Sequence, residues 1–248
     1  MIKLNGEIVK PTMFPDNTSQ VWKLGSITYP SMIEWRFENE SEFIHLIQLY
    51  HLVKDVTGAG VSLKMPYLPY GRQDKQIDNL MTFALVPFLK TLRTMDWSSV
   101  IVYDPHSNVI KEYLSKVTIV NPTIDKLANG YDAVCFPDDG AANKYKTDKK
   151  VIRGHKVRNQ QTGLIEKYSL DCVEDVLKVL VVDDICDGGA TFVLLGEALQ
   201  EKGVEADLYV SHGIFSKGVE HLLKYYGKIT TTDSLVQKYP NLVEVLHV

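Results

Sequence analysis

The chain has 248 residues, 45% of them hydrophobic and 23% charged, with a formal net charge of −4. This size and balance are typical of one large or two small α/β domains. The mildly acidic balance lacks the excess of basic residues that is typical of nucleic-acid-binding proteins. No apolar run is long enough to span a membrane, and the N-terminus lacks the apolar core of a signal peptide. The three cysteines show no metal spacing, so we expect a cytoplasmic protein.

Strand and helix patterns alternate along the chain. We expect strands at Ile27–Tyr29, Ile33–Phe37, Val61–Met65, Ser99–Tyr103, Val117–Val120, Ala133–Phe136, near Val151, Leu177–Val182, Ala206–Ser211, Lys228–Thr230 and Val243–His247, with Gln20–Leu24 strand-like. Helices are expected over Glu40–Asp55, over Thr82–Leu92 with Pro87 near its start, and from the Gly-rich turn at 187–191 to a C-cap at Gly203. This alternation predicts doubly wound parallel sheets, which bind ligands at the carboxyl ends of their strands.

The most informative stretch is VLKVLVVDDICDGGATFV, residues 176–193. An apolar strand ends in the two acids Asp183 and Asp184, and a Gly-rich turn then leads into a helical pattern. Glycines let backbone N–H groups approach an anion, and the start of a helix adds positive potential. The acids can hold sugar hydroxyls or hydrated Mg²⁺. The order of strand, acids, glycines and helix therefore predicts a phosphate site rather than an ordinary turn.

Other polar segments follow neighbouring strands. Arg72 can neutralise a phosphate, and Gln73 and Asp74 can read a base or ribose. His106 could contact a metal or phosphate, and Asp138 could complete a hard-oxygen Mg²⁺ site. Each of these segments alone could equally be a solvated loop, a structural histidine or a turn.

Two weaker signals lie elsewhere in the chain. Lys156 and Arg158 lie in RGHKVRNQQTG, which we expect to be a mobile loop able to close over a transferring phosphoryl group. Phe14 and Asp16 could stack on adenine and accept its amino group. Alone, the first reads more simply as a solvated charge run and the second as a hydrophobic anchor beside a turn.

Together these segments resemble, in chain order, the ribose-phosphate diphosphokinases, which have the type I phosphoribosyltransferase fold. PYLPYGRQDK is similar to the family's PY-x-x-YARQD, VIVYDPHS to its D-x-H strand end, and FPDDGA to its S-P-D-x-G-G loop. HKVRN has its K-x-R spacing, VVDDICDGGAT resembles its ribose 5-phosphate loop, VSHGIFSKGVEHL its T-H-x-x-x-S-G segment, and FPDNT its F-x-D-G-E element. The resemblance runs from about Phe14 to Leu235.

The resemblance implies an α/β fold of two related phosphoribosyltransferase-like (Rossmann-like) halves, with parallel sheets flanked by helices. Residues 1–115 would form the ATP-binding half, with its first unit trimmed, and residues 116–248 the sugar-phosphate half. The implied activity is Mg²⁺-dependent transfer of the β,γ-diphosphoryl group of ATP to the anomeric hydroxyl of ribose 5-phosphate, which releases AMP. Because the family's adenine site spans subunits, a homo-oligomer, a dimer or a hexamer, is expected.

The resemblance also implies a role for each candidate residue. The residues implied to bind ATP are Phe14, Asp16, Arg72, Gln73, Asp74 and His106. His106 and Asp138 would contact the Mg²⁺ ion of the Mg²⁺–ATP complex. Lys156 and Arg158 would stabilise the transferring diphosphoryl group. The ribose hydroxyls are held by Asp183 and Asp184, and the 5-phosphate by Asp187, Gly188, Gly189, Ala190 and Thr191.

The chain departs from the family pattern in three places. The N-terminal half starts about one βα unit short, and QIDNLMT at 76–82 replaces a basic segment that ends in R-E-P, which puts phosphate regulation in doubt. The family's D-T-x-G-T loop reads here Asp187-Gly188-Gly189-Ala190-Thr191, so one threonine hydroxyl is lost. A loop with fewer donors and more room could accept a substituted phosphate. Some relatives of the family transfer diphosphate to ADP-ribose instead, so the resemblance implies ADP-ribose as an alternative acceptor, whose 1-diphosphate would serve NAD synthesis.

Three readings from other classes stay open. A phosphoribosyltransferase would need a hood for a base and would not need the RQDK, FPD and K-x-R segments. A non-catalytic regulatory subunit would keep the fold without the chemistry, although both loop cations and both strand acids are present. A generic sugar-phosphate binding module is the third. A flat response to ATP would favour the third reading, and base-dependent release of diphosphate from phosphoribosyl diphosphate would favour the first.

Overall fold

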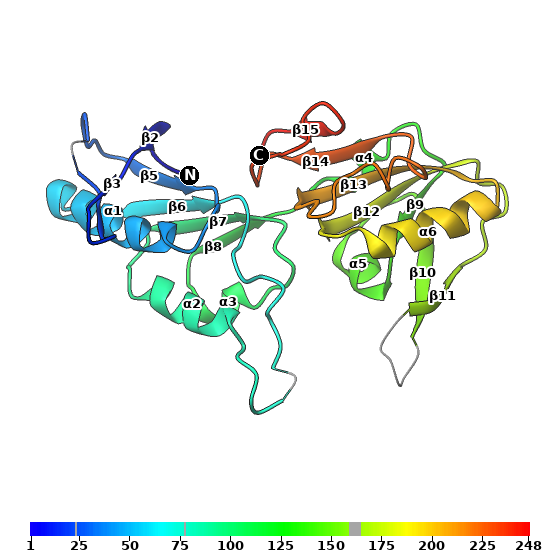
Figure 1. Ribbon diagram of the computed structural model, residues 1–248, viewed down its shortest axis with the longest axis horizontal. Helices are drawn as coiled ribbons and strands as arrows, with labels where there is room; N and C mark the ends of the chain where they lie inside the picture. The colour runs from blue at the N-terminus through cyan, green and yellow to red at the C-terminus, as the bar shows by residue number, and fades with distance from the viewer. Residues whose placement is uncertain (23, 77, 159–164) are drawn as a thin grey trace. The chain divides into compact units, whose positions relative to one another are not determined.

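The computed structural model describes residues 1–22, 24–76, 78–158 and 165–248, with only the backbone at 156–158 and 165–167. Its residues cluster into two compact units, and each is described below by itself. The first unit comprises Met1–Asn121 with Ser234–Val236 and Val248, and the second comprises Pro122–Asp233 with Gln237–His247. Figure 1 shows α/β architecture in both, with mainly parallel sheets flanked by helices.

The first unit is built on a six-stranded mixed sheet in the order β2-β1-β5-β6-β7-β8. Its strands are β1 (Ile2–Leu4), β2 (Glu7–Val9), β5 (Ser31–Trp35), β6 (Val61–Met65), β7 (Ser99–Tyr103) and β8 (Val117–Val120). The helices of this unit are α1 (Glu42–Thr57), α2 (Leu85–Arg93) and α3 (Ile110–Tyr113), and a separate hairpin pairs β3 (Thr12–Met13) with β4 (Ser19–Gln20). The last four strands of the sheet are parallel, so their carboxyl ends share one edge.

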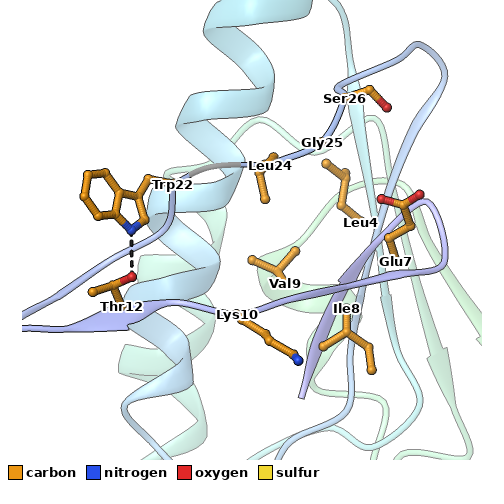
Figure 2. A pocket seen from close by; sticks show the side chains of 10 residues that line it. All are labelled: Leu4, Glu7, Ile8, Val9, Lys10, Thr12, Trp22, Leu24, Gly25 and Ser26. Atoms are coloured by element: carbon orange, nitrogen blue, oxygen red, sulfur yellow. Dashed lines mark hydrogen bonds between the residues drawn. The ribbon is translucent and has the colours of Figure 1, made fainter.

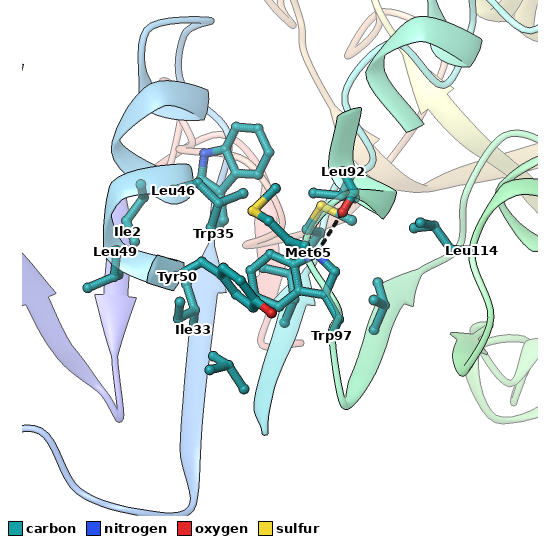
Figure 3. Packing of buried hydrophobic residues seen from close by; sticks show 14 of the residues in the cluster. Ile2, Ile33, Trp35, Leu46, Leu49, Tyr50, Met65, Leu92, Trp97 and Leu114 are labelled. Carbon is teal, nitrogen blue, oxygen red and sulfur yellow. Dashed lines mark hydrogen bonds between the residues drawn. The ribbon is translucent and has the colours of Figure 1, made fainter. Parts of the chain in front are cut away.

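The core of this unit lies between the sheet and its helices (Figure 3). The ring of Tyr50 on α1 meets Trp97 edge-on at a centroid distance of 4.6 Å, and the Trp97 indole N–H donates to the Leu92 carbonyl at 3.1 Å. Trp35 on β5 stacks on Phe43 with 5.9 Å between centroids. Large aromatic side chains thus hold helices from distant parts of the sequence against one sheet.

The second unit has a seven-stranded sheet in the order β11-β10-β9-β12-β13-β14-β15, parallel except for the β10–β11 pair. Its strands are β9 (Ala133–Phe136), β10 (Lys150–Arg158), β11 (Ile165–Leu170), β12 (Lys178–Cys186), β13 (Glu205–Gly213), β14 (Ile229–Thr232) and β15 (Glu244–Leu246). Its helices are α4 (Ile124–Leu127), α5 (Asp139–Lys144) and α6 (Ala190–Glu201).

The two faces of this sheet are covered by different helices. Leu195 and Leu199 of α6 cluster with Val179 and Val181 of β12, whereas α4 and α5 cluster with the alternate β12 residues 180 and 182. Side chains of successive strand residues point to opposite faces, so β12 is buried on both. This arrangement explains the continuous apolar run in its sequence.

Several sequence expectations need correction. Ile27–Tyr29 is not a strand, because the chain turns there toward Pro30, which has no N–H to donate to a ladder. Of Gln20–Leu24, only Gln20 lies in a strand, and residue 23 is outside the described part. The β1–β2 hairpin was not predicted, although Asn5-Gly6, both with positive φ, is a strong hairpin signal. The strand Val117–Val120, assigned to the second half, pairs with β7 in the first unit's sheet.

Candidate functional site

The acid pair lies within β12 rather than beyond its end. The strand continues to Cys186 because it stays paired with β13, where Asp183 is opposite Val210 and Cys186 is opposite Gly213. Asp184 is buried, 5% exposed, and its Oδ2 lies 3.1 Å from Nζ of Lys144 on α5. A cation from a neighbouring helix therefore forms an ion pair with this buried carboxylate.

Asp183 is in a different electrostatic state. Burial raises its pKa well above the ordinary value, and the charges of Asp184 and Asp138 raise the pKa further. The Asp184 N–H donates to Asp183 Oδ1 at 2.9 Å, which opposes the rise only in part. Because Lys144 stabilises the charge of Asp184, protonation within this coupled pair is favoured at Asp183. The pair therefore combines an acid beside a cation with an acid of raised pKa.

Asp138 caps α5 in the loop after β9. Its Oδ1 accepts the Ala141 N–H at 3.0 Å, an N-cap contact that stabilises the first turn of the helix. The charge of Asp138 also acts on Asp183, so strand ends β9 and β12 bring acidic groups near one another. A divalent cation or sugar hydroxyls would relieve this concentration of negative charge.

The Gly-rich loop leads from β12 into α6 with open donors. Gly189 has φ +78°, which glycine adopts without strain, and it is the N-cap of α6 with no side-chain hydrogen bond. The first turn of α6 carries no acidic residue to occupy its N–H groups. Thr191 lies in that turn and is partly exposed. An uncapped helix start beside a glycine turn offers an anion both N–H donors and the helix dipole.

Lys156 and Arg158 lie in β10, which corrects the expectation of a loop there. The strand pairs antiparallel with β11, with Lys156 opposite Tyr168, and it projects beyond the rest of the sheet (Figure 1). A hairpin can leave the sheet because antiparallel pairing satisfies its own backbone groups. The side chains of both cations, and residues 159–164, lie outside the described part of the chain.

The base of this hairpin is anchored by Tyr168. The ring is 9% exposed, and its hydroxyl donates to the carbonyl of Pro137, next to Asp138. Gly154 on β10 leaves room for the ring, since a Cβ there would lie 2.3 Å from the Tyr168 hydroxyl oxygen. The hairpin that carries Lys156 is thereby attached to the acidic β9 loop.

In the first unit, the RQD segment and His106 come together. Arg72 and Gln73 are exposed and Asp74 is partly exposed, in the loop after β6. A Cβ on Gly71 would lie 3.9 Å from Cβ of His106, which follows β7. The carboxyl ends of two adjacent parallel strands therefore bring these candidate ATP contacts side by side, as the strand order predicts.

Phe14 and Asp16 lie at the tip of the β3–β4 hairpin. Asp16 Oδ1 accepts from the Thr18 N–H at 3.0 Å and the Thr18 hydroxyl at 2.7 Å, and these hydrogen bonds lower its pKa. The Phe14 ring is 36% exposed, and its centroid lies 6.3 Å from that of Trp22. Asp16 thus shapes the turn that presents an exposed aromatic ring.

A hollow of about 290 Å³ lies near this aromatic pair (Figure 2). Its wall is apolar at Leu4, Val9 and Leu24, and the Trp22 indole N–H closes one side by donating to the Thr12 hydroxyl at 2.7 Å. None of the predicted site residues lines the hollow.

The candidate metal ligands lie in different units. His106 belongs to the first and Asp138 to the second, and each unit is described by itself. Over the described ranges, no group of three or more His, Cys, Asp or Glu side chains is arranged to hold a metal. A Mg²⁺ ion that keeps water and phosphate ligands needs only one or two protein carboxylates, so the acidic β9 and β12 ends fit such an ion.

Sequence reasoning missed three side chains around the second unit's site. Lys144 pairs with Asp184, and its signal was a lysine at the end of the short helix that follows Pro137-Asp138. His221 and Lys217 lie against the Gly-rich loop, both in the SHGIFSKGVEHL segment. The sequence of that segment resembles the family's T-H-x-x-x-S-G segment, but the pattern predicts no role for either residue.

Comparison with known proteins gives the class first. The fold matches a crystal structure of phosphoribosylpyrophosphate synthetase from Mycobacterium smegmatis with a TM-score of 0.77, covering 97% of this chain and 86% of that one at 16% identity. The chain thus has the two-sheet α/β fold of a phosphoribosylpyrophosphate synthetase.

Sequence relatives extend this similarity over nearly the whole chain. A ribose-phosphate pyrophosphokinase of Sulfurisphaera tokodaii is 23% identical over 97% of this chain and 88% of the relative. Ribose-phosphate pyrophosphokinase 4 of Saccharomyces cerevisiae is 27% identical over 73% of this chain and 60% of the relative. The chain is a distant, full-length homologue of the ribose-phosphate pyrophosphokinases. No family model matches it. Across the described residues, no helix is long and apolar enough to cross a membrane.

Proposed function

We propose that this protein transfers the β,γ-diphosphoryl group of ATP to the anomeric hydroxyl of ribose 5-phosphate, which yields phosphoribosyl diphosphate and AMP. The observation that carries this proposal is the end of β12, where two adjacent acids, one of them paired with Lys144, are followed by a Gly-rich turn and the uncapped start of α6. Full-length relatedness to ribose-phosphate pyrophosphokinases supports the same activity.

In this proposal the second unit binds the acceptor sugar. Asp183 and Asp184 accept or share protons with the ribose hydroxyls, and residues 187–191 bind the 5-phosphate through N–H groups and the Thr191 hydroxyl. Lys144 pairs with Asp184 and orients its carboxylate. A sugar held at both ends presents its anomeric hydroxyl in one place, which is the main source of catalysis in phosphoryl transfer.

The first unit binds ATP in this proposal. Arg72, Gln73, Asp74 and His106 contact the nucleotide, and Phe14 and Asp16 contact the adenine of a neighbouring subunit in a homo-oligomer. Lys156 and Arg158 on the β10–β11 hairpin stabilise charge on the transferring group. Mg²⁺, held by Asp138 and His106 with the nucleotide phosphates, supplies charge neutralisation when bound.

ADP-ribose is the second candidate acceptor. Gly188 has no side chain and is partly exposed in the phosphate loop, and the atoms nearest to it belong to the flexible side chain of Lys217, which can move aside for a substituted phosphate. The same diphosphoryl transfer would then give ADP-ribose 1-diphosphate.

The test is AMP release from ATP and Mg²⁺ with ribose 5-phosphate and with ADP-ribose in parallel, and Lys156→Ala as the inactive control. We expect AMP release with ribose 5-phosphate that disappears in the control. Release with ADP-ribose alone would assign the second acceptor. If neither acceptor gives AMP, both proposed activities are rejected, and a regulatory subunit, a binding module or a phosphoribosyltransferase is favoured. A phosphoribosyltransferase would instead release diphosphate from phosphoribosyl diphosphate when given a base.

A further inference from the structure

Two loops of the second unit are joined beside the predicted phosphate site. The N–H groups of Ile214 and Phe215 both donate to the carbonyl of Cys186, at 2.9 and 3.1 Å. Cys186 directly precedes Asp187 and Gly188, so the segment after β13 is fixed to the start of the Gly-rich loop. Phe215 and Gly218 have φ of +48° and +78°, which gives this segment one defined turn.

Gly188 lies against the side chain of Lys217 on that turn. A Cβ at Gly188 would lie 3.4 Å from both Cδ and Cε of Lys217 and 3.7 Å from its Cγ. The aliphatic part of the Lys217 side chain therefore packs beside Gly188, and its ammonium is one bond beyond Cε. Lys217 is exposed, and no hydrogen bond or ion pair involves its ammonium within the described part of the chain.

His221 fixes the orientation of the same loop. Its Nε2 lies 3.1 Å from the Gly188 carbonyl oxygen and, as the donor, holds that oxygen toward itself. Since a trans peptide directs C=O and N–H to opposite sides, the Gly189 N–H points away from His221. The loop therefore keeps its N–H groups available while its carbonyl is already bound.

The nearby acids do not neutralise Lys217. Glu220 Oε2 accepts the Val219 N–H at 3.0 Å, Asp184 pairs with Lys144, and Asp187 is exposed with partners of its own. A cation with no carboxylate partner next to uncapped helix N–H groups is arranged for an anion.

We propose that Lys217 binds the phosphate on the 5-oxygen of the acceptor ribose, and that His221 is a positioning residue that holds the Gly188–Gly189 peptide for it. This inference rests on the proposed function. Gly188 leaves space that the γ atoms of a threonine would take from the Lys217 side chain, so a cation replaces a hydroxyl as the phosphate contact. A lysine is a point charge without fixed geometry. It favours a dianionic monoester, as in ribose 5-phosphate, over the singly charged phosphate groups of ADP-ribose.

The test measures binding of the acceptor in the absence of ATP. Binding of ribose 5-phosphate and of ADP-ribose is measured by phosphorus NMR titration, and binding of unphosphorylated ribose by calorimetry. The variants are Lys217→Met, Lys217→Arg and, as a matched control at the other end of α6, the exposed Lys202→Met. We expect Lys217→Met to weaken ribose 5-phosphate binding about tenfold or more. Lys217→Arg should keep most of the affinity, Lys202→Met all of it, and ribose binding should not change.

The outcomes separate this inference from the proposed function. Unchanged ribose 5-phosphate binding in Lys217→Met, with wild-type AMP release, overturns the role of Lys217 alone. Equal weakening of ribose and ribose 5-phosphate also overturns it, because the loss would then not concern the phosphate. Absence of binding of either acceptor to the wild-type protein overturns both. For His221, the His221→Gln variant, which keeps a donor, should bind the phosphate better than His221→Ala; equal affinities reject the positioning role.

Discussion

Lys144 Nζ and Asp184 Oδ2 form an ion pair of 3.1 Å between α5 and the carboxyl end of β12. The two side chains are 19% and 7% exposed, so the charges are largely removed from water. Lys144→Met should lower the free energy of unfolding by about 2 to 3 kcal/mol, because a buried carboxylate loses its cation. Urea unfolding measures this loss. The exposed Lys146→Met is the control, and an equal effect of both variants would show that the pair is unimportant.

Asp183 should make the protein less stable as the pH rises. Its folded pKa is raised, so the native state binds the proton more tightly than the unfolded chain. Its stabilising contribution is full below the unfolded pKa of about 3.9 and is lost as the pH rises toward the folded value. Asp183→Asn should therefore raise Tm relative to wild type at about pH 8, with a difference that shrinks toward about pH 4. A lower Tm for the variant at high pH would contradict this. The variant should also lose AMP release.

Gly154→Ala should disturb the hairpin that carries Lys156. The new Cβ would lie 2.3 Å from the Tyr168 hydroxyl oxygen and 2.5 Å from Cε1, so the ring must move. We expect a loss of about 1 to 3 kcal/mol in unfolding free energy, together with a lower kcat. Gly25→Ala, where nothing lies within 4 Å, is the control and should behave as wild type. A fully active, stable Gly154→Ala protein would exclude the anchoring role.

The two glycines of the phosphate loop should respond differently to alanine. Gly189 has φ +78°, and its Cβ would lie 2.7 Å from His221 Nε2 and 3.0 Å from Leu222 Cδ2. Gly188 has no such constraint, and its nearest contact would be 3.4 Å. Gly189→Ala should cost about 2 kcal/mol or more, and Gly188→Ala less than about 1 kcal/mol, in urea unfolding. The reverse order would mean that the loop relaxes freely.

The exposed Phe14 ring allows a test of a site shared between subunits. Phe14→Ala should raise KM for ATP several-fold with little change in kcat, as expected for loss of about 1 kcal/mol of stacking. The neighbouring exposed Met13→Ala is the control. If Phe14 acts in a neighbouring subunit, mixing Phe14→Ala with inactive Lys156→Ala subunits should produce some sites with wild-type KM. Kinetics that equal the sum of the two separate proteins, after subunit exchange is verified, would place Phe14 in its own subunit's site.

Local pattern determined much of the fold in advance. Four strands have the predicted bounds, because each is a short apolar or alternating run with turn residues after it: Val61–Met65, Ser99–Tyr103, Val117–Val120 and Ala133–Phe136. Errors occurred where pairing overrode local composition. The polar Lys156–Arg158 segment is a strand because β11 pairs with it, and β12 extends through its acids because β13 continues beside it.

The sequence alone determined the order of strands and loops, and hence that RQD would lie near DPH within the first unit, because parallel strands place their carboxyl ends at one edge. Only the tertiary structure decided which side chains contact one another around the phosphate loop of the second unit. Lys144 meets Asp184 forty residues along the chain, and Lys217 meets Gly188 across β13. Such contacts depend on strand order and helix placement, which short-range periodicity does not encode. They also place a cation beside Asp184, whereas burial and the neighbouring acids raise the pKa of Asp183.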